Sequence, residues 1–167
     1  MVSLARRLFP EELGQSIVEF SLALPILVFG LIGGSDLARA FAIQLAVQNG
    51  ARAGAEAAAV TYSGPMGTLT AARAKDEINR TPYLNASNAT ITVTFKQTDG
   101  TTDCLTTVPT VAAPCFATVR VQYTFTTIIP WPIIPSSATF DRSTTMRTIS
   151  APAGVASYTC GPGYTAC

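Results

Sequence analysis

The strongest pattern in the chain is an apolar run close to its N-terminus. Phe20 to Gly34 is interrupted only by Ser21 and spans fifteen residues, about 22 Å of helix at 1.5 Å per residue. A bilayer core is about 30 Å thick, so this run alone is short for a membrane span. The stretch from Gln15 to Gly34 has twenty residues and reaches about 30 Å. The span therefore fits the membrane only if Glu19 enters the membrane or its interface.

Basic residues precede this run, and an acidic residue follows it. Arg6 and Arg7 lie before the span and Asp36 lies after it, so the positive-inside rule predicts a cytoplasmic N-terminus and an extracytoplasmic body. A cleaved secretory signal is the alternative, with small residues near Gly33 and Ala38 as its cleavage site. The carboxylate at the start of the apolar core, and the helix-forming residues beyond that site, favour an uncleaved span.

The helical pattern continues past the span to about residue 60. Residues 36–60 are rich in alanine and lack proline, and polar side chains recur there at every fourth position, at Gln44, Gln48, Arg52 and Glu56. Small side chains also recur every fourth residue, which permits close helix packing, although a segment this rich in Ala and Gly also produces such rows by chance. This row comprises Gly30, Gly34, Ala38, Ala42, Ala46, Gly50, Gly54 and Ala58. The pattern predicts one helix over about 15–60, kinked or loosened at Pro25.

The rest of the chain changes from helical to strand periodicity. Residues 62–67 are rich in Gly and Pro, and a short helix is predicted from Thr70, as its cap, to Asn79, with Pro82 as the stop. Apolar and polar residues then alternate over 89–95 and 118–125, and a third strand is expected over 139–149. The apolar, proline-rich segment 128–135 is interpreted as a hydrophobic flap over the sheet, in preference to a contact surface for a partner.

These elements predict an α+β fold with a small antiparallel sheet. The expected organisation is a leader over 1–14, a transmembrane segment over 15–35, an extracytoplasmic continuation of the helix over 36–60, and an extracytoplasmic α+β domain over 61–167.

Composition excludes several classes of function. The chain has no histidine, which removes the commonest general base and metal ligand, and the net charge of +1 comes from scattered residues, which argues against nucleic-acid binding. No acid/base pair, cofactor site or metal cluster is visible, so we expect no enzyme; a serine–lysine arrangement involving Lys75 or Lys96 is the only catalytic alternative.

Four cysteines lie late in the chain, without the paired spacing of zinc ligands. They favour two disulfides outside the reducing cytoplasm. Three pairings are open from the sequence, and the local one is preferred because each bond then closes a short loop: Cys104 with Cys115 and Cys160 with Cys167.

A glycine, a polar residue and then a glutamate five positions after the glycine, ahead of an apolar helix, resemble the processing site of type IV pilin-like precursors. More narrowly, GQSIVEFSLALP (14–25), DLARAF (36–41) and NGAR (49–52) resemble the TadE-like family of tight-adherence pilus assembly proteins. The apolar loop and last strand of the chain are also similar to the tails of such proteins.

The resemblance implies a pilin-like fold, cleavage of a leader and assembly into a pilus. A prepilin peptidase would cut between Gly14 and Gln15, leaving 153 residues (167 minus 14). The product would be a minor pilin or pseudopilin in a Tad/Flp-type adhesive pilus, anchored in the bacterial inner membrane. Its partners would be other pilins and the pilus secretion platform. The competing hypothesis is a membrane-tethered extracytoplasmic binding module without a pilus role, recognising a surface ligand such as a glycan.

Cleavage would also give Glu19 a partner. The new ammonium of Gln15 would lie about one helical turn from Glu19, in the same chain or in a neighbour. A charge at the bilayer centre costs roughly 2.5 to 3.5 kcal/mol on insertion scales, and such an ion pair offsets much of that cost. The alternative is that Glu19 merely extends to the cytoplasmic interface.

Overall fold

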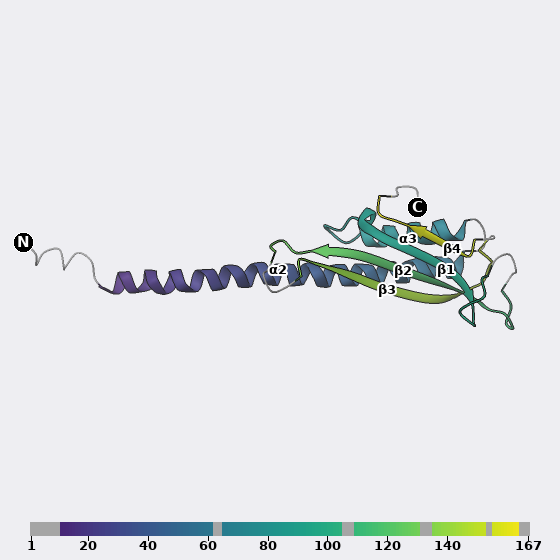
Figure 1. The fold of residues 1–167 in the computed structure, drawn as a ribbon, viewed down its shortest axis with the longest axis horizontal. Coiled ribbons are helices and arrows are strands. Elements are labelled where there is room, and N and C mark those ends of the chain that lie inside the picture. Colours follow the sequence, from purple (N-terminus) through teal and green to yellow (C-terminus); the bar gives the residue numbers. More distant parts are fainter. Residues whose placement is uncertain (1–10, 62–64, 105–108, 131–134, 153–154, 164–167) are drawn as a thin grey trace, which may run out of the picture. The chain divides into compact units, whose positions relative to one another are not determined.

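The computed structural model describes residues 11–61, 65–104, 109–130, 135–152 and 155–163, with the side chains of 11–13 left aside. The helices are α2 (Glu11–Val60), α3 (Met66–Asn79) and the short 3-10 helix η1 (Ala86–Asn88). The strands are β1 (Ala89–Gln97), β2 (Cys115–Thr126), β3 (Ser137–Thr148) and β4 (Ser157–Cys160) (Figure 1). The predicted α+β class is confirmed. The chain divides into two compact units, 1–39 and 40–167, which are described separately.

In the first unit, the described residues are all helical. α2 already includes Glu11, four residues before the predicted start, and it continues as α-helix through Pro25. Proline lacks an N–H, so the carbonyl of Ser21 loses its usual intrahelical donor. The hydroxyl of Ser21 donates to a different acceptor, the carbonyl of Val18, at 2.8 Å.

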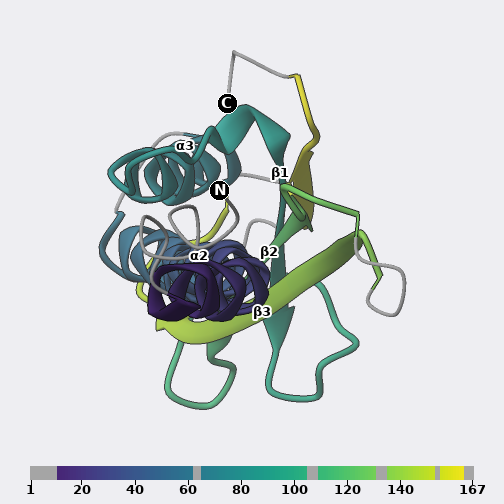
Figure 2. The ribbon, with the colours of Figure 1, turned by 90° about the vertical axis from the view of Figure 1, so that its left-hand side faces the viewer.

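The second unit is built on one antiparallel sheet with the strand order β3-β2-β1-β4. Figure 2 shows the twist of this sheet, with α3 and the later turns of α2 to one side of it. The inward face carries the alternating apolar residues that the sequence predicts for β1 and β2, and all are buried. They are Ile91, Val93 and Phe95 on β1, and Val119, Val121, Tyr123 and Phe125 on β2.

Close approach of α2 to its neighbours closes the core. A Cβ built on Gly50 would lie 2.8 Å from Cγ1 of Ile78 in α3. One built on Gly54 would lie 3.0 Å from Cγ1 of Val119 and 3.2 Å from Cβ of Ala74. Only glycine lets the helix backbone come this near, so the second half of the small-residue row packs inside the protein's own second unit.

The predicted start and cap of the second helix are wrong, and one strand was not predicted. α3 begins at Met66 rather than Thr70, after Pro65, whose position provides no side-chain cap. Thr70 is therefore not a cap but a fully buried residue inside the helix, and its hydroxyl has no hydrogen-bond partner within the described part of the chain. The third strand is present as β3, but the sequence did not predict β4, which pairs with β1 through Ile91↔Cys160 to Thr94↔Ser157. The predicted flap falls partly outside the described residues, at 131–134.

Candidate processing and assembly site

The first turns of α2 carry the residues at which the resemblance implies processing. Within the twenty-residue span, large apolar side chains are exposed on every side of the helix, including Ile17, Phe20, Ile26 and Leu31 at 63 to 74 %. A helix that is apolar all round is unstable in water and is typical of a membrane span. Among the described residues, one helix is thus long and apolar enough to cross a membrane, as predicted.

Gln15 and Glu19 lie on the same face of α2, one turn apart. The side-chain amide Nε2 of Gln15 donates to Oε1 of Glu19 at 2.9 Å. This contact places residue 15 within reach of the carboxylate before any cleavage. The amide is neutral, so it satisfies one acceptor position of Glu19 without balancing its charge.

No described side chain packs against Gly14. A Cβ built on it would meet nothing within 4 Å, and the same holds for Gly30 and Gly34. A larger side chain at Gly14 therefore fits the fold. Any requirement for glycine at this position would therefore come from outside the chain's own packing, as in a reaction on the chain.

Charged residues on α2 beyond the span form local ion pairs. Arg39 Nη1 lies 3.3 Å from Asp36 Oδ1, and Arg52 Nε lies 2.8 Å from Glu56 Oε1, one turn further along the polar stripe. α3 places further charges beside the second pair, and a shallow polar groove runs between the two helices. The sequence did not indicate the α3 side of this groove, which is formed by Arg73 and Glu77.

Comparison with known proteins finds a family that most of α2 resembles. Residues 14–56 match the model of the TadE-like protein family. The resemblance stated above is thus confirmed for this segment, which begins at Gly14 and ends at Glu56. It indicates a part in the Tad pilus system and in its assembly machinery generally. No curated protein and no solved structure matches the chain.

The cysteines lie beyond the TadE-like segment. The structure contains a disulfide between Cys104 and Cys115, one of the two local pairings that the sequence favours, and both residues are buried. Cys160 is also disulfide-bonded. The expected pairing of Cys160 with Cys167 lies outside the described residues.

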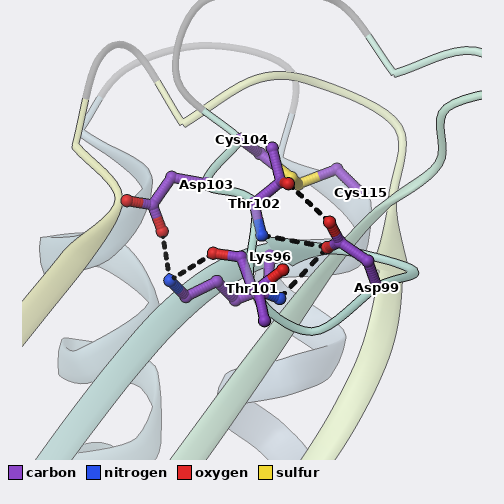
Figure 3. A network of polar contacts seen from close by, with 7 residues as sticks. All are labelled: Lys96, Asp99, Thr101, Thr102, Asp103, Cys104 and Cys115. Atoms are coloured by element: carbon purple, nitrogen blue, oxygen red, sulfur yellow. Dashed lines mark hydrogen bonds and ion pairs between the residues drawn. A yellow bond between two sulfur atoms is a disulfide. The ribbon is translucent and has the colours of Figure 1, made fainter.

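The first disulfide ties down a polar turn between β1 and β2 (Figure 3). The carboxylate of Asp99 accepts hydrogen bonds from the backbone N–H groups of Thr101 and Thr102, at 3.0 and 2.9 Å, and from the hydroxyl of Thr102. These bonds, the hydroxyl of Thr102 first, hold the pKa of Asp99 well below its usual range. Lys96 forms an ion pair with Asp103 and donates to the carbonyl of Thr101 at 3.1 Å.

The turn is held together by its own polar contacts. The ammonium of Lys96 already occupies the space between Asp103 and the carbonyl of Thr101. Among the described residues, no group of three His, Cys, Asp or Glu side chains is placed to hold a metal ion.

The outward face of the sheet also lies outside the TadE-like segment, and hydroxyl side chains dominate it. Arg120 and Asp141 form an ion pair near its middle, with Arg120 Nε 2.9 Å from Asp141 Oδ1, and this pairing lowers the pKa of Asp141. Around the pair lies a shallow depression lined by threonine and serine, namely Thr92, Thr94, Thr118 and Ser143. This face offers neutral donors and acceptors but few unpaired charges.

Proposed function

We propose that the protein is a membrane-anchored minor pilin or pseudopilin that contributes to assembly of a Tad/Flp-type adhesive pilus. The observation that carries the proposal is the coincidence of two features on α2. The TadE-like match begins at Gly14, and the next residue, Gln15, lies within hydrogen-bond distance of the span's carboxylate, Glu19. A pilin-like precursor cut after Gly14 would convert this neutral contact into an ion pair.

Removal of residues 1–14 would supply the missing charge. The α-ammonium of Gln15 would then lie at the first turn of the helix, close to Glu19. Within or near hydrocarbon, a carboxylate paired with an ammonium is far less costly than an isolated one. If the ammonium belongs to a neighbouring subunit, the ion pair also fixes the axial register between the two helices.

The proposed location and partners follow from the same residues. The span would lie in the bacterial inner membrane with its N-terminus in the cytoplasm and residues 36–167 outside. The partners would be prepilin peptidase, other pilins or pseudopilins, and the membrane-embedded pilus secretion platform. In this proposal the protein has a structural role in assembly and catalyses no reaction.

Substitution of Gly14 tests the proposal. Because a Cβ at Gly14 meets nothing within 4 Å, Gly14→Leu should leave the fold unchanged but abolish cleavage by a co-expressed prepilin peptidase. Gly30→Leu is the matched control, since Gly30 is equally open on the same helix, and it should be cleaved like the unaltered protein. Intact mass of the membrane-extracted proteins gives the result. Equal processing of both variants would contradict the proposed site.

The alternative of a membrane-tethered binding module has one observation in its favour. The hydroxyl-lined outward face around Arg120 and Asp141 suits a neutral, polyhydroxylated ligand such as a glycan. The mature N-terminus discriminates the two functions, because a plain anchor would keep its leader in cells that contain the peptidase.

A further inference from the structure

Two sequons for N-linked glycosylation follow one another in the connection between α3 and β1. They are Asn85-Ala86-Ser87 and Asn88-Ala89-Thr90, and neither has a proline at its middle position. Both asparagines are exposed, and the whole connection belongs to the second unit. The sequence treats the two sequons alike, so only the structure can distinguish them.

The side chain of Asn85 already contacts the hydroxyl of its own sequon. Asn85 Oδ1 accepts hydrogen bonds from the backbone N–H of Ser87 at 2.9 Å and from the hydroxyl of Ser87 at 2.6 Å. Both bonds use the oxygen of the amide, and Nδ2 has no hydrogen bond to a described residue. The nitrogen that would carry a sugar is therefore exposed, while the sequon's hydroxyl lies on the same amide group.

The fold around Asn85 is compatible with a sugar on Nδ2. Asn85 caps η1 through its side-chain oxygen, and a substituted amide keeps that oxygen as an acceptor. Other bonds hold the same connection in place. The N–H of Ala86 donates to Oδ1 of Asn79 at 2.9 Å, and the N–H of Gly163 donates to the carbonyl of Ser87 at 2.9 Å. Substitution at Nδ2 thus leaves the cap and its surroundings intact.

Asn88 lacks this arrangement. Ala89 and Thr90 already belong to β1, where Thr90 pairs with Gln122 of β2. A strand advances about 3.4 Å per residue, and its ladder prevents the turn that would bring the hydroxyl of Thr90 back to the amide of Asn88. Within the described part of the chain, these two side chains have no contact like that of Asn85 with Ser87.

The turn before Asn85 contains an unusual aromatic residue. Tyr83 has a φ of 68°, in the left-handed region that favours glycine, and it is fully exposed, at 102 %. This conformation costs free energy, and the ring buries no surface in return. An exposed ring two positions before the acceptor offers an apolar surface to the C–H face of a sugar.

We propose that Asn85 is an acceptor site for an N-linked saccharide and that Asn88 is not. In the reaction, Nδ2 of Asn85 forms a bond to C1 of a saccharide that is carried by a lipid pyrophosphate. The bond between C1 and the phosphate oxygen breaks, and the lipid pyrophosphate leaves with that electron pair. One proton of Nδ2 passes to a base of the transferase, and no oxidant or reductant is needed.

This inference rests on the proposed function only for the extracytoplasmic location of the second unit, where the transferase would act. It depends neither on leader cleavage nor on pilus assembly. A saccharide at Asn85 is bulky and hydrated, and it would shield the exposed turn around Tyr83 from water and from proteases.

Peptide mass spectrometry tests the site. The full-length protein is produced in cells that contain an oligosaccharyltransferase for Asn-X-Ser/Thr sequons and its lipid-linked donor. Trypsin cleaves after Arg80 and Lys96, so residues 81–96 form one peptide with both sequons. An N-glycosidase in heavy-oxygen water converts a modified asparagine to a labelled aspartate. Fragment masses should place the label at residue 85 and leave residue 88 unlabelled.

Two variants form a matched pair, because each removes the hydroxyl of one sequon and leaves the other sequon complete. Ser87→Ala should abolish the modification, whereas Thr90→Ala should leave it at the level of the unaltered protein. Ser87→Thr keeps a hydroxyl at the same position and should retain the modification.

The outcomes separate the inference from the location of the second unit, which is measured by adding protease outside spheroplasts of the same cells. Label at residue 88, or modification that persists in Ser87→Ala, would overturn the choice of Asn85. Unmodified protein whose second unit is digested from outside would overturn the inference and leave the location standing. Unmodified protein that is protected from the protease would contradict the location, and the inference with it.

Discussion

Loss of the disulfide between Cys104 and Cys115 should destabilise the second unit by a free energy that follows from the length of the loop that the bond closes. The bond joins residues eleven apart in the sequence. In the chain-entropy model, a closed loop of that length contributes about 3 kcal/mol at 25 °C by restricting the unfolded chain. For a unit of this size, 3 kcal/mol corresponds to a fall in Tm of about 10 °C. The double variant Cys104→Ala/Cys115→Ala is expected to show this loss.

Hydrogen exchange of the full-length protein in detergent measures the effect where it should occur. Amides of β1 and β2 report the free energy of opening of the sheet, while the membrane span contributes separate peptides. The single variants Cys104→Ala and Cys115→Ala serve as controls. Because either one breaks the bond, each should cost about as much as the double variant rather than half of it. A loss below about 1 kcal/mol in the double variant would refute the loop-closure reasoning.

Three further predictions concern packing, pH and assembly. Gly54→Ala should destabilise the second unit by about 1 kcal/mol, since overpacking against Val119 and Ala74 outweighs the gain in helix propensity. In a double-mutant cycle of unfolding free energies, Val119→Ala should partly relieve this destabilisation. A Gly54→Ala variant more stable than the unaltered protein would contradict the close approach. Because the pKa of Asp99 is depressed in the folded protein, the contribution of its carboxylate to folding stability should be complete above about pH 4 and decrease as the pH falls further. The stability difference between Asp99→Asn and the unaltered protein should therefore shrink in acid. A difference that is constant from pH 7 to pH 2 would exclude this effect. Glu19→Ala should be cleaved yet fail to support piliation, whereas Glu56→Gln, which alters a carboxylate further along the same helix, should assemble normally. Normal piliation by Glu19→Ala would indicate that Glu19 only extends to the membrane interface and has no part in assembly.

The sequence predicts elements well where the pattern is local. Alternation over β1 and β2 assigns each side chain to the correct face, because a strand turns successive residues to opposite sides. β4 escapes prediction because four residues are too few for a period and its strand conformation depends on pairing with β1, more than sixty positions earlier. Thr70 is misassigned for a similar reason. Threonine is a common cap, but here α2 packs over the helix start and buries the residue.

The candidate site is likewise predictable from the sequence only where the pattern is local. Resemblance to pilin-like processing sites selects Gly14, whereas the four-residue spacing of Gln15 and Glu19 places those two on one face of the helix. The small-residue row is visible in the sequence, but its role at Gly50 and Gly54 is decided by α3 and β2, which no local pattern specifies. Arg73 and Glu77 likewise reach the groove on α2 only through that packing.

The mature N-terminus is the measurement that tests the account most directly. Protein from membranes of cells that contain a prepilin peptidase is digested, and its N-terminal peptide is identified by mass spectrometry. The account predicts a terminus at Gln15 in those cells and at Met1 in cells without the peptidase. A terminus at Met1 in both, or a cut beyond Gly33, would contradict the central claim that the chain is processed as a pilin-like subunit.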